Sequence, residues 1–181
     1  MKFAGKHILM GVTGSIAAYK AAVLVRGLVK EGADVKVVMT PLAKQLIARL
    51  TRDTLYRRPV LGDFFNLENV EWNRIVSLGE WCGLYLMTPG TASTMGKMAH
   101  GIADNLLLTC YLSARCPVAG DPAMDLDMYA HPTTHENMEK LRSLGVHIVE
   151  PGSGELASGL CGKGRMAEPE EIIDRIAAIM G

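Results

Sequence analysis

Short runs of apolar residues alternate along the chain with longer segments of helical periodicity. Five such runs predict strands, at residues 7–10, 35–39, 84–87, 117–119 and 146–149. Most of them are continuously apolar rather than alternating, which is typical of strands covered on both faces of a parallel sheet. The run at 117–119 is the poorest, because Gly120 and Asp121 interrupt it.

The segments between these runs predict helices. From Ile16 to Glu31, apolar residues recur at three-and-four spacing, and Gly32 follows where a helix end favours a left-handed residue. Thr40 predicts the cap of a second helix and Pro41 its first turn. Further helices are expected at residues 92–100, 105–114, 133–144 and from 168 onward.

This alternation predicts a single α/β domain over residues 1–181, with right-handed crossovers and a mostly parallel sheet. In such a sheet, ligands bind beyond the carboxyl ends of the strands. The loops that follow the strands are therefore the places to look for chemistry.

Composition narrows the class of protein. The chain has 181 residues, 49% of them hydrophobic, with 19 basic and 19 acidic residues. Hydrophobicity at this level excludes intrinsic disorder. A net charge of zero gives no sign of the basic surface that binds nucleic acid. No apolar run reaches the roughly 18–20 residues of a membrane span, and the N-terminus does not resemble a signal peptide. The four cysteines show no metal-binding spacing, so we expect a cytoplasmic protein.

Two loops carry small and hydroxyl-bearing residues ahead of a helix. In the first, Gly11, Gly14 and Ser15 let the backbone approach a ligand, and the helix that follows presents free N–H groups that suit a phosphate. The second loop, at 91–94, reaches the same edge of the sheet. Thr40, rather than an acidic ribose-binding residue, ends the second strand, which favours a mononucleotide. A tight turn without a ligand is the alternative.

Two later segments are also candidates. Residues 122–129 carry Asp125 and Asp127, and His131 and His135 follow, but neither pair has the accompanying ligands of a metal site, so we expect no metal. Residues 152–166 are rich in glycine, which predicts either disorder or a mobile flap over a site. Cys161 lies within this segment, and an inert cysteine is the alternative reading there.

Five motifs occur in an order that resembles a known family. They are Gly-Val-Thr-Gly-Ser-Ile-Ala-Ala-Tyr-Lys at 11–20, Val-Met-Thr-Pro at 38–41, Pro-Gly-Thr-Ala-Ser-Thr at 89–94, Pro-Ala-Met-Asp-Leu-Asp-Met-Tyr at 122–129 and Gly-Lys-Gly-Arg-Met at 162–166. Together they resemble the homo-oligomeric flavin-containing cysteine decarboxylase family, and within it the phosphopantothenoylcysteine decarboxylases. The first loop of the sister flavin prenyltransferases differs from residues 14–17 here.

The resemblance implies a Rossmann-like or flavodoxin-like three-layer sandwich, bound FMN, a phosphopantothenoylcysteine-like substrate, and trimers that assemble further into dodecamers, with flavin sites between subunits. The catalytic residues it implies are Cys161 in the flap, with Ser158 at the usual cysteine position, and Asp125, where the family has an asparagine that meets the substrate carboxylate. The cofactor-binding residues it implies are Gly11, Thr13, Gly14, Ser15, Ile16, Thr40, Thr91, Ala92, Ser93, Thr94 and Met124.

The sequence also departs from the family. Ile75 fills the position of the catalytic histidine, and an aliphatic side chain cannot move a proton. Asp121 and Asp125 add carboxylates that would repel a substrate carboxylate. We therefore expect impaired decarboxylase activity, unless another group such as His100 serves. The alternative is a remodelled or engineered oligomeric scaffold without catalysis, in keeping with the unusually polar Arg49, Arg52 and Asp53.

Overall fold

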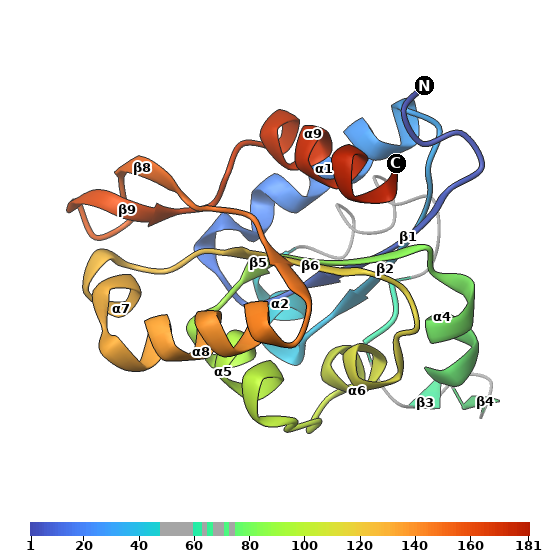
Figure 1. Cartoon of the computed structure of the whole chain (residues 1–181), viewed down its shortest axis with the longest axis horizontal. Coiled ribbons are helices and arrows are strands. Elements are labelled where there is room, and N and C mark those ends of the chain that lie inside the picture. The colour runs from blue at the N-terminus through green and yellow to red at the C-terminus, as the bar shows by residue number, and fades with distance from the viewer. Residues whose placement is uncertain (48–59, 63–64, 67–70, 73–74) are drawn as a thin grey trace.

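The computed structural model describes residues 1–47, 60–62, 65–66, 71–72 and 75–181 (Figure 1). Arg49, Arg52 and Asp53 lie outside the described residues. The central sheet has five parallel strands in the order β2-β1-β5-β6-β7. The strands are β1 (His7–Val12), β2 (Asp34–Met39), β5 (Leu84–Gly90), β6 (Val118–Pro122) and β7 (Val146–Ile148). This order is that of a flavodoxin-like doubly wound sheet, as expected.

Helices cover both faces of the sheet (Figure 1). One face carries α1 (Tyr19–Lys30) and α9 (Pro169–Met180), and the other carries α4 (Ile75–Trp81), α5 (Ala92–His100), α6 (Leu106–Ser113) and α8 (Pro132–Ser143). The short elements are η1 (Ile16–Ala18) before α1, α2 (Pro41–Leu46) after β2, α7 (Leu126–Ala130) before α8, and the paired strands β3 (Phe65–Asn66) and β4 (Glu71–Trp72). None of the helices described is long and apolar enough to cross a membrane.

The apolar strands supply two cores, one on each face of the sheet. Successive side chains of a strand point to opposite faces, so Ile8 and Met10 pack toward α1 and α9, while Leu9 packs on the other side. All three side chains are fully buried. The continuous apolar run is thus explained by burial on both faces, and the three-layer prediction is confirmed.

One expectation about local structure was wrong, and one of the two alternatives for the glycine-rich segment is excluded. The strand at 117–119 is not interrupted: β6 continues through Gly120 and Asp121 to Pro122, because the buried Asp121 carboxylate is hydrogen-bonded. The glycine-rich segment is not disordered either. It forms an antiparallel hairpin of β8 (Gly152–Glu155) and β9 (Cys161–Arg165), which lies beside α7 in Figure 1.

Candidate functional site

Three loops meet at the carboxyl ends of β1, β2 and β5. β1 lies between β2 and β5, so the strands that follow it along the chain are added first on one side of β1 and then on the other. Such a switch point is where sheets of this type bind ligands. The Thr13 hydroxyl is buried and donates to the Pro89 carbonyl, and it accepts a bond from the Thr91 N–H at 3.1 Å. The Thr40 N–H donates to the Val12 carbonyl at 3.0 Å. These bonds hold the three loops together.

The loops border an open cavity of about 390 Å³. Its lining residues are Gly14, Thr40, Pro41, Leu42, Thr91, Ser93, Thr94, Lys97, Asp104 and Asn105. Two helices of eight or more residues begin here: the Thr91 hydroxyl accepts from the Thr94 N–H at 3.2 Å to cap α5, and the Asn105 side chain accepts from the Leu108 N–H at 2.9 Å to cap α6. Two helix N-termini and several hydroxyls therefore face one space, which suits an anion.

Five of the residues expected to bind a cofactor line this cavity together: Gly14, Thr40, Thr91, Ser93 and Thr94. Ser15, Ile16 and Ala92 adjoin them in sequence, and Ile16 is exposed. The buried Thr13 lies behind the cavity as the link between the loops.

The glycine at position 11 is explained by close packing in the core. A Cβ there would come within 2.8 Å of the Met87 sulfur and 3.1 Å of the Tyr85 hydroxyl, so glycine lets β1 and β5 pack closely.

Five lining residues were not predicted as site residues: Pro41, Leu42, Lys97, Asp104 and Asn105. Lys97 and Asp104 form an ion pair at 2.6 Å at the edge of the cavity. The only signal for them in the sequence was Asn105, whose side chain is a strong helix cap directly before an apolar run. Lys97 lies within the predicted helix at 92–100, and nothing in its sequence context distinguishes it from an ordinary exposed lysine.

The remaining predicted residues gather around the hairpin. The Asp125 carboxylate accepts a bond from the Leu126 N–H at 2.9 Å, which caps α7, and a second from the Ser158 hydroxyl at 2.7 Å. The Met124 N–H donates to the Gly164 carbonyl at 3.0 Å. Cys161, on β9, is exposed. Asp125 and the position expected for the family cysteine are therefore in direct contact.

Glycines in β9 permit this close approach. Gly164 has a φ of +136°, and a Cβ there would lie 2.5 Å from the Met124 carbonyl oxygen. A Cβ on Gly162 would lie 2.5 Å from the Leu126 side chain. The glycine content of this segment reflects packing of the hairpin onto residues 124–126, and not only conformational freedom.

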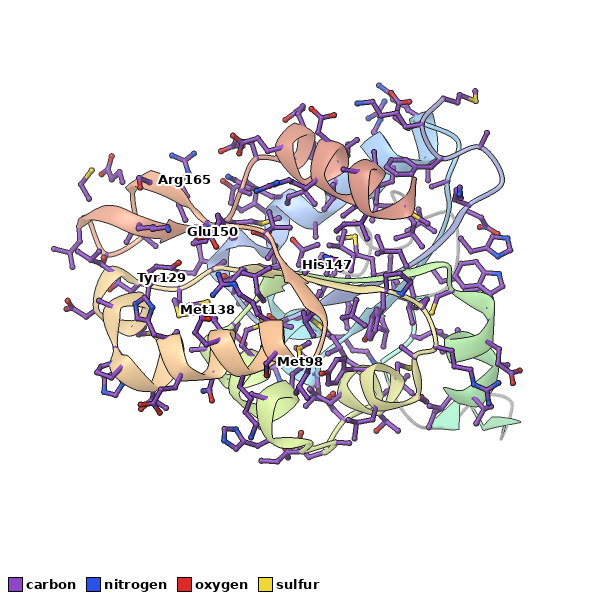
Figure 2. The ribbon with its side chains drawn as sticks, viewed as in Figure 1. Met98, Tyr129, Met138, His147, Glu150 and Arg165 are labelled. Carbon is purple, nitrogen blue, oxygen red and sulfur yellow. The ribbon has the colours of Figure 1, made fainter. Side chains whose placement is uncertain are left out.

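Ion pairs add to the anchorage of the hairpin. The Lys163 ammonium contacts Glu150 at 3.0 Å and lowers the pKa of that carboxyl, while Arg165 contacts Glu168 at 3.2 Å. Figure 2 shows Glu150 and Arg165 on the side of the molecule where the hairpin lies, with Tyr129 of α7 below them. The two cations that follow Cys161 in the sequence, Lys163 and Arg165, are thus paired with carboxylates.

Ile75 is not among the described residues that line the cavity. It begins α4, half-buried, and packs against the core on that face of the sheet. His100 bonds to the Gly96 carbonyl at 2.9 Å at the end of α5. His131 caps α8, and the His135 ring lies edge-on to Tyr129.

Comparison with known proteins gives a consistent set of relatives. The model of the family described as Flavoprotein matches residues 2–181. A cysteine/cysteine sulfinic acid decarboxylase from an unknown prokaryotic organism is 63% identical over 131 residues, covering 72% of this chain and 36% of that protein. The coenzyme A biosynthesis bifunctional protein CoaBC of Bacillus subtilis strain 168 is 41% identical over 168 residues, covering 93% of this chain and 41% of that protein.

The chain therefore spans about two fifths of the length of these curated relatives. Among solved structures, a PPC decarboxylase mutant complexed with pantothenoylaminoethenethiol superimposes with a TM-score of 0.84 at 28% identity, covering 96% of this chain and 97% of the other. The FMN-dependent cysteine decarboxylase SpaF superimposes with a TM-score of 0.83 at 26% identity, covering 98% of both chains.

Proposed function

Because the chain belongs to the flavoprotein family, we propose that it binds FMN and catalyses the decarboxylation of a cysteine-type substrate. The observation that carries this proposal is the cavity where the loops after β1, β2 and β5 meet, since hydroxyls and helix N-termini face it from three sides. The solved structures of similar fold include FMN-dependent cysteine decarboxylases, which supports the cofactor.

The donor set of the cavity fits the phosphate end of FMN. Thr40, Thr91, Ser93 and Thr94 offer hydroxyls, and the first turn of α5 offers backbone N–H groups that the helix leaves unpaired. Gly14 leaves room for the ligand at the remaining wall. When bound, FMN supplies an oxidant for the substrate thiol, which creates the electron sink needed for loss of carbon dioxide.

The chemistry of Asp125 favours the free amino acid cysteine as substrate, since cysteine sulfinic acid has no thiol for FMN to oxidise. An acidic side chain binds an α-ammonium group through a charge-assisted hydrogen bond. Phosphopantothenoylcysteine has an uncharged amide at that nitrogen, so it lacks this attraction, and nothing offsets the repulsion that Asp125 exerts on the carboxylate of either substrate. The 63% identical relative is named for the two free amino acids, which supports this choice.

Activity on phosphopantothenoylcysteine is correspondingly impaired in this proposal. Ile75 offers no ionisable group at the position of the family histidine, and general acid–base catalysis contributes about 10²–10⁴-fold. The same observation favours a second candidate function, an oligomeric scaffold that retains the fold without catalysis. Carbon dioxide release from either cysteine or phosphopantothenoylcysteine contradicts the scaffold.

We also propose a homo-oligomer, a trimer or a dodecamer, in the cytoplasm. Apolar side chains that are more than half exposed gather on η1, α1 and α2, next to the cavity: Ile16, Tyr19, Val23, Leu42 and Leu46. Burying them against a second copy removes apolar surface from water and covers the open side of the cavity. Light scattering at known concentration measures the assembly.

The test of substrate choice compares Asp125→Asn with the wild type. Asparagine is an equally good helix cap, and its oxygen accepts the same two bonds, so the fold is preserved. Loss of the charge-assisted bond lowers kcat/KM for cysteine by about 10- to 100-fold. Turnover of phosphopantothenoylcysteine rises.

Asp127 provides the matched control, because it lies exposed on the same short helix. Asp127→Asn should leave the activity on both substrates unchanged. The proposed substrate class is wrong if Asp125→Asn and Asp127→Asn behave alike, or if the wild type acts on phosphopantothenoylcysteine as well as on cysteine.

A further inference from the structure

Asp121 is a buried carboxyl group that the proposed function does not use. It lies in β6 with no solvent exposure, one residue before the segment that carries Met124 and Asp125. Burying an ionisable group is costly unless its oxygens have hydrogen-bond partners. The partners of Asp121 therefore show what the group holds in place.

Both carboxylate oxygens have partners that lie far away in the sequence. The Thr88 hydroxyl donates to Oδ2 at 2.7 Å, and the Ala167 N–H donates to Oδ1 at 3.3 Å. Thr88 belongs to β5, directly ahead of the loop that lines the cavity. Ala167 lies in residues 166–168, which connect β9 of the hairpin to α9 (Figure 1).

A second buried side chain, that of Lys20, also binds residues 166–168. The Lys20 ammonium of α1 donates to the Met166 carbonyl at 3.4 Å and to the Glu168 carboxylate at 2.8 Å. The Lys20 side chain is only 9% exposed. The base of the hairpin is thus fastened from β6 and from α1.

We propose that Asp121 is a positioning residue that latches the base of the β8–β9 hairpin to β5 and β6, and that ionisation of its carboxyl group loosens this latch. The hairpin carries Cys161 and Ser158, so the latch sets how firmly these residues are held beside Asp125. The inference goes beyond the proposed function, because it concerns the protein without any substrate.

The direction follows from the surroundings of Asp121. Burial raises its pKa to about 7, although the bonds from Thr88 and Ala167 and the charge of Lys20 act in the opposite direction. Glu171 of α9 raises the pKa further, and Glu168 is paired with Lys20. Thr88 is the polar contact from β5 and does not titrate at these pH values.

Opening of residues 166–168 exposes Asp121 to water and returns its pKa to the ordinary value near 3.8. The closed latch therefore binds protons more tightly than the open one, so the open form gains population as pH rises from 4 to 7 and then stays constant. With these two values the opening constant increases by about 80-fold between pH 5 and pH 8.

Hydrogen exchange of the purified full chain, followed by mass spectrometry, measures this opening. Peptides that cover residues 161–168 should lose protection with rising pH after correction for the intrinsic exchange rate. Peptides from β1, in the middle of the sheet, serve as the internal reference. The proposal is overturned if protection of residues 161–168 changes no more between pH 5 and pH 8 than that of β1.

Asp121→Asn provides the variant arm, because an amide mimics the neutral acid: it accepts from the Ala167 N–H and donates to the Thr88 hydroxyl. Its hairpin protection should be high and independent of pH. Asp174→Asn is the control, since Asp174 is exposed and paired with Lys2. That variant should behave as the wild type.

Thr88→Val provides a second test in case Asp121→Asn does not fold. Removing the hydroxyl takes away a bond that lowers the pKa of Asp121, so the loss of protection should continue to a higher pH than in the wild type. An Asp121→Asn or Thr88→Val protein with the wild-type pH dependence contradicts the role of Asp121.

Discussion

Replacing Gly164 by alanine tests the contact between β9 and residues 124–126. Gly164 adopts a φ of +136°, a region that essentially only glycine occupies, and forcing alanine into it costs about 1–3 kcal/mol. The new Cβ would also lie 2.5 Å from the Met124 carbonyl oxygen, which forces the backbones apart. The bond from the Met124 N–H to the Gly164 carbonyl is then weakened, at a further cost of about 1 kcal/mol.

Gly159→Ala is the matched control within the same hairpin. Gly159 also has a positive φ, +83°, but a Cβ there meets nothing within 4 Å. Its replacement costs only the backbone strain, about 1 kcal/mol. The difference between the two variants therefore reports the close approach of β9 to Met124 together with the greater backbone strain at Gly164.

Urea unfolding gives the free energy of unfolding of both variants, and limited trypsin digestion reports whether the hairpin has detached from residues 124–126. We expect Gly164→Ala to lose about 3 kcal/mol, or to be cut rapidly after Lys163 and Arg165 because the hairpin detaches. The reasoning is refuted if Gly164→Ala matches Gly159→Ala in both stability and digestion.

The other predictions concern the cavity, the latch and the family histidine. Thr91→Ala removes the cap of α5, so urea unfolding should show a loss of about 1 kcal/mol and an FMN titration a weaker affinity; an unchanged affinity contradicts the assigned role. Asp121→Asn removes a raised pKa, so from pH 4 to pH 7 the wild type should lose about 3 kcal/mol of unfolding free energy relative to the variant; parallel curves contradict the burial effect. Ile75→His should raise carbon dioxide release from phosphopantothenoylcysteine at least tenfold, and no gain contradicts the idea that this position limits that reaction. Cys161→Ser should slow turnover without changing FMN affinity, whereas full activity removes Cys161 from the chemistry.

The sequence predicts the elements that local signals determine. Residues 92–100 form a helix because Thr91 caps its start and Gly101, with a φ of +67°, ends it, and both signals lie within the segment itself. The meeting of Thr40 with residues 91–94 could also be predicted, since the carboxyl ends of parallel strands share one edge.

The hairpin and the buried carboxyl could not be predicted, because their causes lie far away in the sequence. From the sequence, Gly164 resembles an ordinary loop glycine, and only the structure shows that Met124 packs against it. Asp121 reads as an interruption of a strand until its partners are known, and these are 33 and 46 residues away. Long-range partners of this kind leave no periodic pattern in the chain.

The most direct test of the account is a titration of the purified chain with FMN, followed by flavin fluorescence and repeated with a variant that carries both Thr91→Ala and Ser93→Ala. The account predicts saturable binding with one flavin per chain, weakened at least tenfold by the two substitutions, because each removes a hydroxyl from the wall of the cavity. Binding that the double variant leaves intact, or no binding by the wild type, would contradict it.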